Sequence, residues 1–127
     1  MPPQIMSTLL LLAGPSSVGK TTLAVALQRM LPEPWVFLPA DVLTNGFPRD
    51  RREFISIEMD QRLRRAALRA LTAFIDAELN VIGEAYVWDP GMRELAASVF
   101  KGRRVFVVKL ECDVRIREER EGRRAIN

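Results

Sequence analysis

Histidine is absent from this 127-residue chain, and cysteine occurs once, at Cys112. Without histidine, His-based catalytic triads and most zinc sites are excluded. A single cysteine cannot close a disulfide within the chain, which favours a reducing compartment, so we expect a cytoplasmic protein. The apolar run Leu9–Ala13 is far shorter than the ~20 residues of a membrane span. It also has no Lys or Arg before it, unlike a secretory signal.

The chain also has only a small excess of positive over negative residues, with a net charge of +3. That balance suits an anionic ligand but lacks the concentrated basic face of a nucleic-acid-binding protein. We therefore expect neither a nucleic-acid partner nor a membrane partner. Apolar residues make up 48% of the chain and charged residues 28%, which indicates one globular domain over residues 1–127.

Apolar periodicity predicts strands alternating with helices. The strands are expected at 7–13, 35–38, 80–87 and 105–110, the third weakened by Gly83. Helices are expected from Lys20 to the prolines at 32 and 34, from about 54 to 79, at 92–100, and from 113 onward, with a loop at 44–52. This order is typical of an α/β fold with an open parallel sheet, which binds ligands at the C-terminal ends of its strands.

A phosphate-binding loop follows the first expected strand. Its pattern, G-x-x-x-x-G-K-[ST], is met by Gly14, Pro15, Ser16, Ser17, Val18, Gly19, Lys20 and Thr21. Such a loop turns backbone N–H groups toward an anion, and the start of the next helix adds positive potential. The lysine can reach the β- and γ-phosphates of ATP, and the threonine hydroxyl can ligate Mg²⁺. The alternative is a glycine turn with an incidental lysine, which the strand-to-helix context disfavours.

Carboxylates follow the second and third expected strands. Asp41 is a candidate general base for an acceptor hydroxyl, or else a turn or helix cap. Glu84 is a candidate for holding the metal, with Asp89 competing for that role and a solvent-facing strand end as the alternative. The residues alone leave these alternatives open.

Arginines alternate with glutamates after the fourth expected strand. Arg120 or Arg124 could neutralise the transferring phosphoryl group, acting from a mobile lid. A salt-bridged surface helix is the simpler interpretation for most of this run. The arginines of the long helix, at 62, 65 and 69, are interpreted as a solvated face, and Trp35 as a core residue.

With these residues placed, the sequence resembles the chloramphenicol phosphotransferase-like family of P-loop kinases. The resemblance rests on the loop, on Leu31-Pro32-Glu33-Pro34-Trp35, on Asp41, and on the segment from Val105 to Asp113. It implies a three-layer P-loop kinase fold and ATP-dependent phosphorylation of a hydroxyl on a small molecule. It also implies Asp41 as base and Glu84 as one of an acidic pair, whose first position is Gly83 here. Chloramphenicol itself does not follow, because the region between Asp41 and the third strand diverges.

The resemblance also implies a fifth strand and a last helix after Asn127, so the chain is expected to be cut short within the lid. The fourth strand would then be an exposed apolar edge, and we expect a homodimer through it or weak nucleotide affinity. Three functions remain open at this point. They are a kinase for a small-molecule hydroxyl, including a toxin-like kinase for nucleotide sugars; a nucleotide-binding protein without transfer; and an interaction module that uses the fourth strand.

Overall fold

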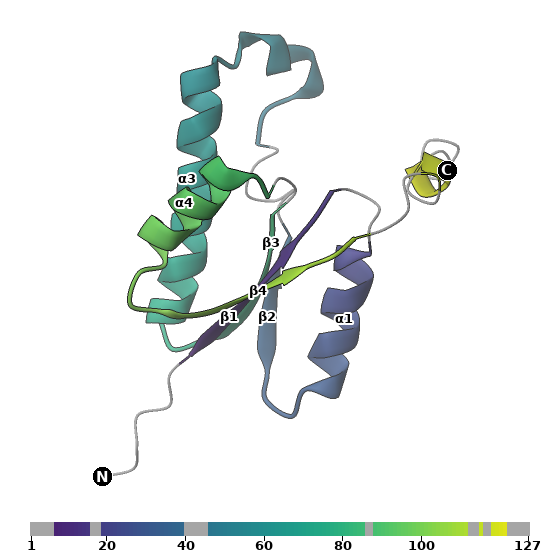
Figure 1. The fold of residues 1–127 in the computed structure, drawn as a ribbon, viewed down its shortest axis with the longest axis vertical. Coiled ribbons are helices and arrows are strands. Elements are labelled where there is room, and N and C mark those ends of the chain that lie inside the picture. Colours follow the sequence, from purple (N-terminus) through teal and green to yellow (C-terminus); the bar gives the residue numbers. More distant parts are fainter. Residues whose placement is uncertain are drawn as a thin grey trace.

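The computed structural model describes residues 7–15, 19–39, 46–85, 88–111, 115 and 118–121, without the side chains of Arg49 and Arg52. Within these residues, four strands and three long helices follow one another (Figure 1). They are β1 (Thr8–Ala13), α1 (Lys20–Met30), β2 (Trp35–Leu38), α3 (Ile57–Asp76), β3 (Asn80–Ala85), α4 (Pro90–Val99) and β4 (Arg104–Lys109), with a 3-10 helix at Arg49–Phe54 between β2 and α3.

The strands form one fully parallel sheet in the order β2-β3-β1-β4. Helix α1 covers one face, and α3 and α4 cover the other (Figure 1). This confirms the predicted α/β fold with an open parallel sheet. Parallel pairing places the C-terminal ends of all four strands along one edge of the sheet, where such folds bind their ligands.

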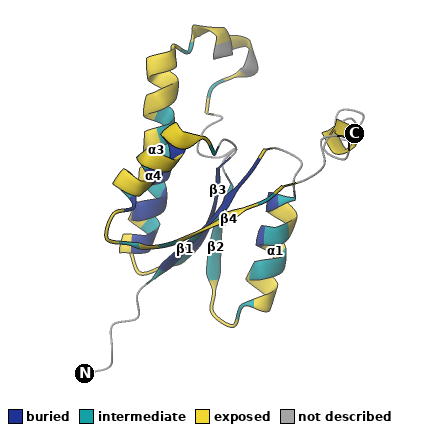
Figure 2. Cartoon of the chain, in the orientation of Figure 1, coloured by how far each residue is buried: buried dark blue, intermediate teal, exposed yellow. Residues whose placement is uncertain are grey.

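Two apolar layers hold the helices to the sheet, and the alternation of side chains along β1 and β3 divides the residues between them. The layer under α3 and α4 contains Leu9, Leu11, Val81, Leu71 and Ile75. The layer under α1 is smaller and centres on Leu12, Ala24 and Ile82. In Figure 2 the two central strands are accordingly buried, while the outer surfaces of the helices are exposed.

Several element boundaries differ from the sequence prediction. The long helix starts at Ile57 rather than near residue 54, because the Ser56 hydroxyl accepts a hydrogen bond from Met59 N at 3.1 Å and caps it. Residues 49–52, predicted as loop, belong to the 3-10 helix. The last short helix begins at Pro90, since the Asp89 side chain caps it. The described part of the chain contains no helix with the length and apolarity to cross a membrane.

Strand β4 is an edge strand with apolar side chains exposed on both faces. Phe106, Val107 and Val108 are 50%, 42% and 39% exposed. Its inner side pairs with β1 over the whole strand, and no described residue pairs with its outer side. An unpaired apolar edge of this kind is a template for pairing with another chain.

We predict that the 127-residue chain self-associates through the outer edge of β4. The variant Val107→Lys, which puts a charge on the exposed edge, should shift the chain toward monomer in sedimentation velocity or size-exclusion chromatography. Met30→Lys is the matched control, because Met30 is 79% exposed on α1, away from the edge. A wild-type chain that stays monomeric at high micromolar concentration would contradict the prediction.

Candidate functional site

The glycine loop begins where three strands end. Gly14 N donates to Ala85 O at 2.9 Å, and Leu110 N donates to Ala13 O at 2.8 Å. These bonds extend the pairing of β1 with β3 and β4 by one residue, so the loop rises directly from the carboxyl edge of the sheet. The loop ends at Gly19, whose φ of 105° lies in the left-handed region that favours glycine. Ser16, Ser17 and Val18 lie outside the described residues.

Lys20 is the first residue of α1 and is only 4% exposed. Its ammonium donates to the carbonyl oxygen of Gly14 and, at 2.8 Å, to that of Pro15. The side chain therefore folds back toward the start of the loop. The first turn of α1 has no acidic residue and no side-chain cap. Positive charge and helix-terminal amides thus meet at one place, as an anionic phosphate chain requires.

Thr21 and Glu84 come together next to that loop. The Thr21 hydroxyl donates to Glu84 Oε1 at 3.1 Å, although the two residues belong to α1 and β3. Glu84 is only 8% exposed, and a carboxylate buried to this degree needs hydrogen bonds or a nearby positive charge to remain ionised. A hydroxyl and a carboxylate are oxygen ligands of the type that Mg²⁺ prefers. The two residues fit a magnesium ion, and their role as its ligands stays a prediction.

Gly83 occupies the position at which the family resemblance implies the first of two acidic residues. The absence of that acid leaves the contact between Thr21 and Glu84 intact. Adjacent residues of a strand point to opposite faces, so position 83 faces α3 while Glu84 faces α1. A Cβ at position 83 would lie 2.9 Å and 3.0 Å from the two terminal methyl carbons of Leu71. An acid there would enter the apolar layer under α3, on the far side of the sheet from Thr21.

Other candidate residues from the sequence have varied outcomes. The Asp89 carboxylate accepts a hydrogen bond from Met92 N at 2.8 Å, so it acts as a helix cap. Both tryptophans pack against apolar layers, and the buried Nε1 of Trp35 has no hydrogen-bond partner in the described part of the chain. Arg120 lies exposed in the helical segment 118–121. Asp41 and Arg124 lie outside the described residues, so their predicted roles stay predictions.

A hollow of about 490 Å³ lies between the first half of α3 and the start of α4. Because α4 begins just after the end of β3, the hollow lies toward the same carboxyl edge of the sheet as the glycine loop, although on the opposite face from α1. Its lining mixes charged, amide and apolar side chains: Ile57, Asp60, Gln61, Arg64, Arg65, Asp89, Gly91, Met92 and Leu95. This group could not be recognised in the sequence, because only the packing of two helices brings these residues together.

Residues 7–125 match the family described as chloramphenicol phosphotransferase-like protein. The chain belongs to this family. A relative from Mycobacterium tuberculosis strain H37Rv, named "Putative O-phosphotransferase Rv2636", is 26% identical over 142 residues. That alignment covers 93% of this chain but only 61% of the relative, so the chain spans less than two thirds of the length of the relative it matches.

Solved P-loop kinases share the fold of this family member. The M. tuberculosis APS kinase CysC, solved in complex with AMPPNP and APS, superposes with a TM-score of 0.76 at 22% identity, over 98% of this chain and 75% of the other. A gluconokinase from Sinorhizobium meliloti superposes with a TM-score of 0.67 at 16% identity, over 98% and 69%. At these identities the likeness shows the fold alone.

We predict that Gly83→Ala destabilises the chain by about 1–3 kcal/mol, because its new methyl group overpacks against Leu71. Urea unfolding followed by circular dichroism measures this loss. Gly46→Ala is the control and should change stability by less than about 0.5 kcal/mol, since a Cβ there meets no atom within 4 Å. In the double variant Gly83→Ala/Leu71→Ala the losses should not add, and strict additivity would show that the two positions do not interact.

Proposed function

We propose that this chain carries the catalytic part of an ATP-dependent kinase that transfers the γ-phosphate to a hydroxyl group of a small molecule. One observation carries the proposal: the Thr21 hydroxyl donates to the buried Glu84 carboxylate at 3.1 Å, and the neighbouring residue Lys20 directs its ammonium to the carbonyl oxygens at the start of the glycine loop. Phosphate-binding charge and oxygen ligands for a metal therefore lie side by side. Membership of the chloramphenicol phosphotransferase-like family supports the same reaction.

In this proposal each residue has a distinct task. The loop amides and Lys20 bind the triphosphate and stabilise charge on the β- and γ-phosphates. Thr21 and Glu84 would hold a magnesium ion, which supplies charge neutralisation to the phosphates when bound. The acceptor oxygen bonds to the γ-phosphorus, the bond to the β,γ-bridging oxygen breaks, and ADP leaves. Asp41 takes the proton of the acceptor hydroxyl, and Arg120 and Arg124 add positive charge near the transferring group.

The hollow between α3 and α4 is the proposed place for the body of the acceptor. Its volume of about 490 Å³ is within the range of ordinary small-molecule pockets. Met92 and Leu95 offer an apolar surface, while Gln61 and the Asp60–Arg64 ion pair offer hydrogen-bonding groups at the rim. That lining suits a molecule with both apolar and polar groups.

We predict that Asp41→Asn lowers kcat by about 100-fold or more while leaving nucleotide affinity within about threefold, because the variant lacks the proton acceptor but keeps the loop. Transfer from labelled ATP to a panel of hydroxylated antibiotics, nucleosides and sugars gives the rate, and calorimetry gives the affinity. Unchanged turnover would remove Asp41 from the mechanism. Nucleotide binding by the wild-type chain without transfer to any acceptor would favour the non-transferring alternative.

We predict that Glu84→Gln raises the Mg²⁺ concentration needed for half-maximal nucleotide binding by at least tenfold, because a neutral amide is a weaker ligand than a carboxylate. Titration of Mg²⁺ against a fluorescent ATP analogue measures the change. Asp89→Asn is the control: asparagine caps a helix as well as aspartate does, so the Mg²⁺ dependence should stay that of the wild type. A shift in the control rather than in Glu84→Gln would reassign the metal site to Asp89.

A further inference from the structure

A second hollow, of about 370 Å³, lies between α3 and α4 and has three arginines in its wall. The lining residues come from α3, from α4 and from the turn before β4: Arg65, Arg69, Thr72, Leu95, Ser98, Val99 and Arg103. No acidic residue is among them. Arg103 directly precedes β4, so this end of the hollow lies at the N-terminal edge of the sheet, opposite the glycine loop.

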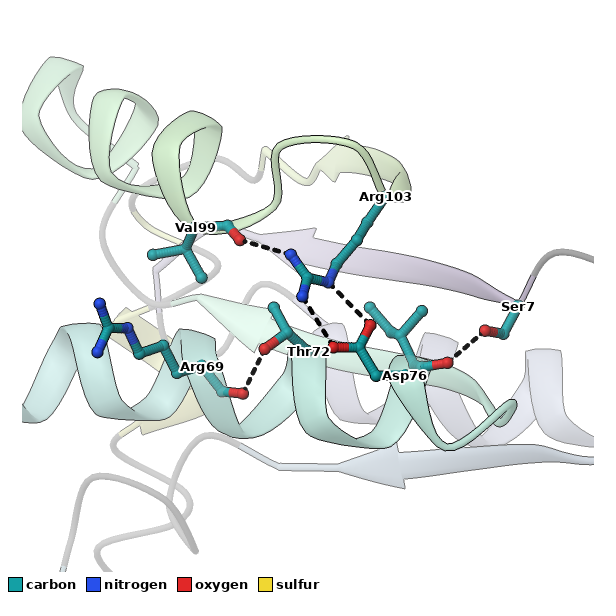
Figure 3. Close-up of polar contacts among 7 residues, drawn as sticks. Ser7, Arg69, Thr72, Asp76, Val99 and Arg103 are labelled. Carbon is teal, nitrogen blue, oxygen red and sulfur yellow. Dashed lines mark hydrogen bonds and ion pairs between the residues drawn. The ribbon is translucent and has the colours of Figure 1, made fainter.

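Arg103 is held in position by a bidentate ion pair with Asp76. Its Nε and Nη2 donate to the two carboxylate oxygens of Asp76 at 3.0 Å and 2.8 Å, and its Nη1 donates to Val99 O at 3.2 Å (Figure 3). The hydrogen bond from Arg103 also lowers the pKa of Asp76, so the pair stays charged at neutral pH. Of the five N–H donors of a guanidinium, these contacts use three.

Arg65 and Arg69 contribute two exposed positive charges from α3. They lie one turn apart on α3, a spacing at which like charges repel one another and destabilise a helix. Neither forms an ion pair with a described residue, whereas Arg64 of the same helix pairs with Asp60 at 3.0 Å. Figure 3 shows Arg69 on the same side of α3 as Arg103, with Thr72 between them.

The hydroxyls of the wall differ in what they can donate. The Thr72 hydroxyl already donates to the carbonyl oxygen of Arg69 at 2.7 Å, so it is not available to donate to a ligand. Ser98, on the facing side of α4, is exposed and can supply a donor. The hollow therefore presents guanidinium forks from one helix and a hydroxyl from the other, above apolar surface from Leu95 and Val99.

We propose that this hollow binds the phosphate group of a small phosphorylated molecule, at a site separate from the nucleotide loop. Guanidinium forks match the oxygens of phosphate in paired hydrogen bonds, which makes arginine the preferred residue for phosphate recognition. The volume admits a small ligand rather than an extended polymer. A bound dianion would also offset the repulsion between Arg65 and Arg69 and link α3 to α4. The proposal does not depend on the phosphotransfer reaction.

Pyrophosphate is the probe, titrated by calorimetry at constant ionic strength into the chain carrying Lys20→Ala, which weakens the loop site. We expect one pyrophosphate bound per chain, and a loss of at least tenfold in affinity when Arg65→Gln and Arg69→Gln are added. The pair Arg62→Gln/Arg93→Gln is the matched control. It removes the same charge from α3 and α4 outside the hollow and should change affinity by less than threefold.

A second variant tests the hollow without removing its arginines. Ser98→Glu places a carboxylate in the wall, where it should pair with the guanidinium groups, abolish pyrophosphate binding and raise the unfolding temperature. The same titrations can be repeated with chains that have Lys20 and are saturated with a non-hydrolysable ATP analogue. The analogue then occupies the loop site, so pyrophosphate binding reports on the hollow without the Lys20→Ala substitution. Equal affinity with and without Arg65 and Arg69, equal weakening by the control pair, or no binding at millimolar pyrophosphate would each overturn the proposal. None of these outcomes would affect the test of Asp41.

Discussion

The parallel pairing of β1 with β3 is the constraint on which the candidate site depends. It sets Leu12 beside Glu84 and Ala13 beside Ala85, and the ladder closes with the bond from Gly14 N to Ala85 O. The glycine loop and the end of β3 are therefore fixed relative to one another by backbone hydrogen bonds. A slip of one residue would move Glu84 to the face covered by α3 and separate it from Thr21.

The helices on the two faces of the sheet position the remaining residues of the proposed sites. Helix α1 starts at Lys20, immediately after a left-handed glycine. Its first turn directs the Lys20 ammonium to the carbonyl oxygens that follow β1 and the Thr21 hydroxyl to Glu84 on β3. Helices α3 and α4 cover the opposite face and leave two hollows along their shared surface. The proposed nucleotide site thus lies on the face of the sheet that α1 covers, and the two hollows lie on the other face.

Much of this arrangement could be predicted from the sequence, because the information was local. The loop motif, the apolar runs of β1 and β4, and the prolines after α1 each indicate their structure within a few residues. Helix starts at Ile57 and Pro90 were misplaced because the deciding signals were single capping side chains, Ser56 and Asp89. The burial of Glu84 and the recess beside Arg65 and Arg69 depend on which face of the sheet meets which helix. Helical periodicity placed those arginines on a solvated surface, and both are exposed in the structure, but it could not show the recess beside them.

The contact between Gly83 and Leu71 links two positions that are far apart in the chain. The methyl groups of Leu71 occupy the space that the Cβ atom of a larger residue at position 83 would need, so the two side chains compete for the same volume. Any relative with a carboxylate at position 83 would need a smaller or polar residue opposite it on the long helix. Substitutions at the two sites are thus expected to occur as matched pairs during divergence, and a sequence that changes only one of them would carry a packing defect.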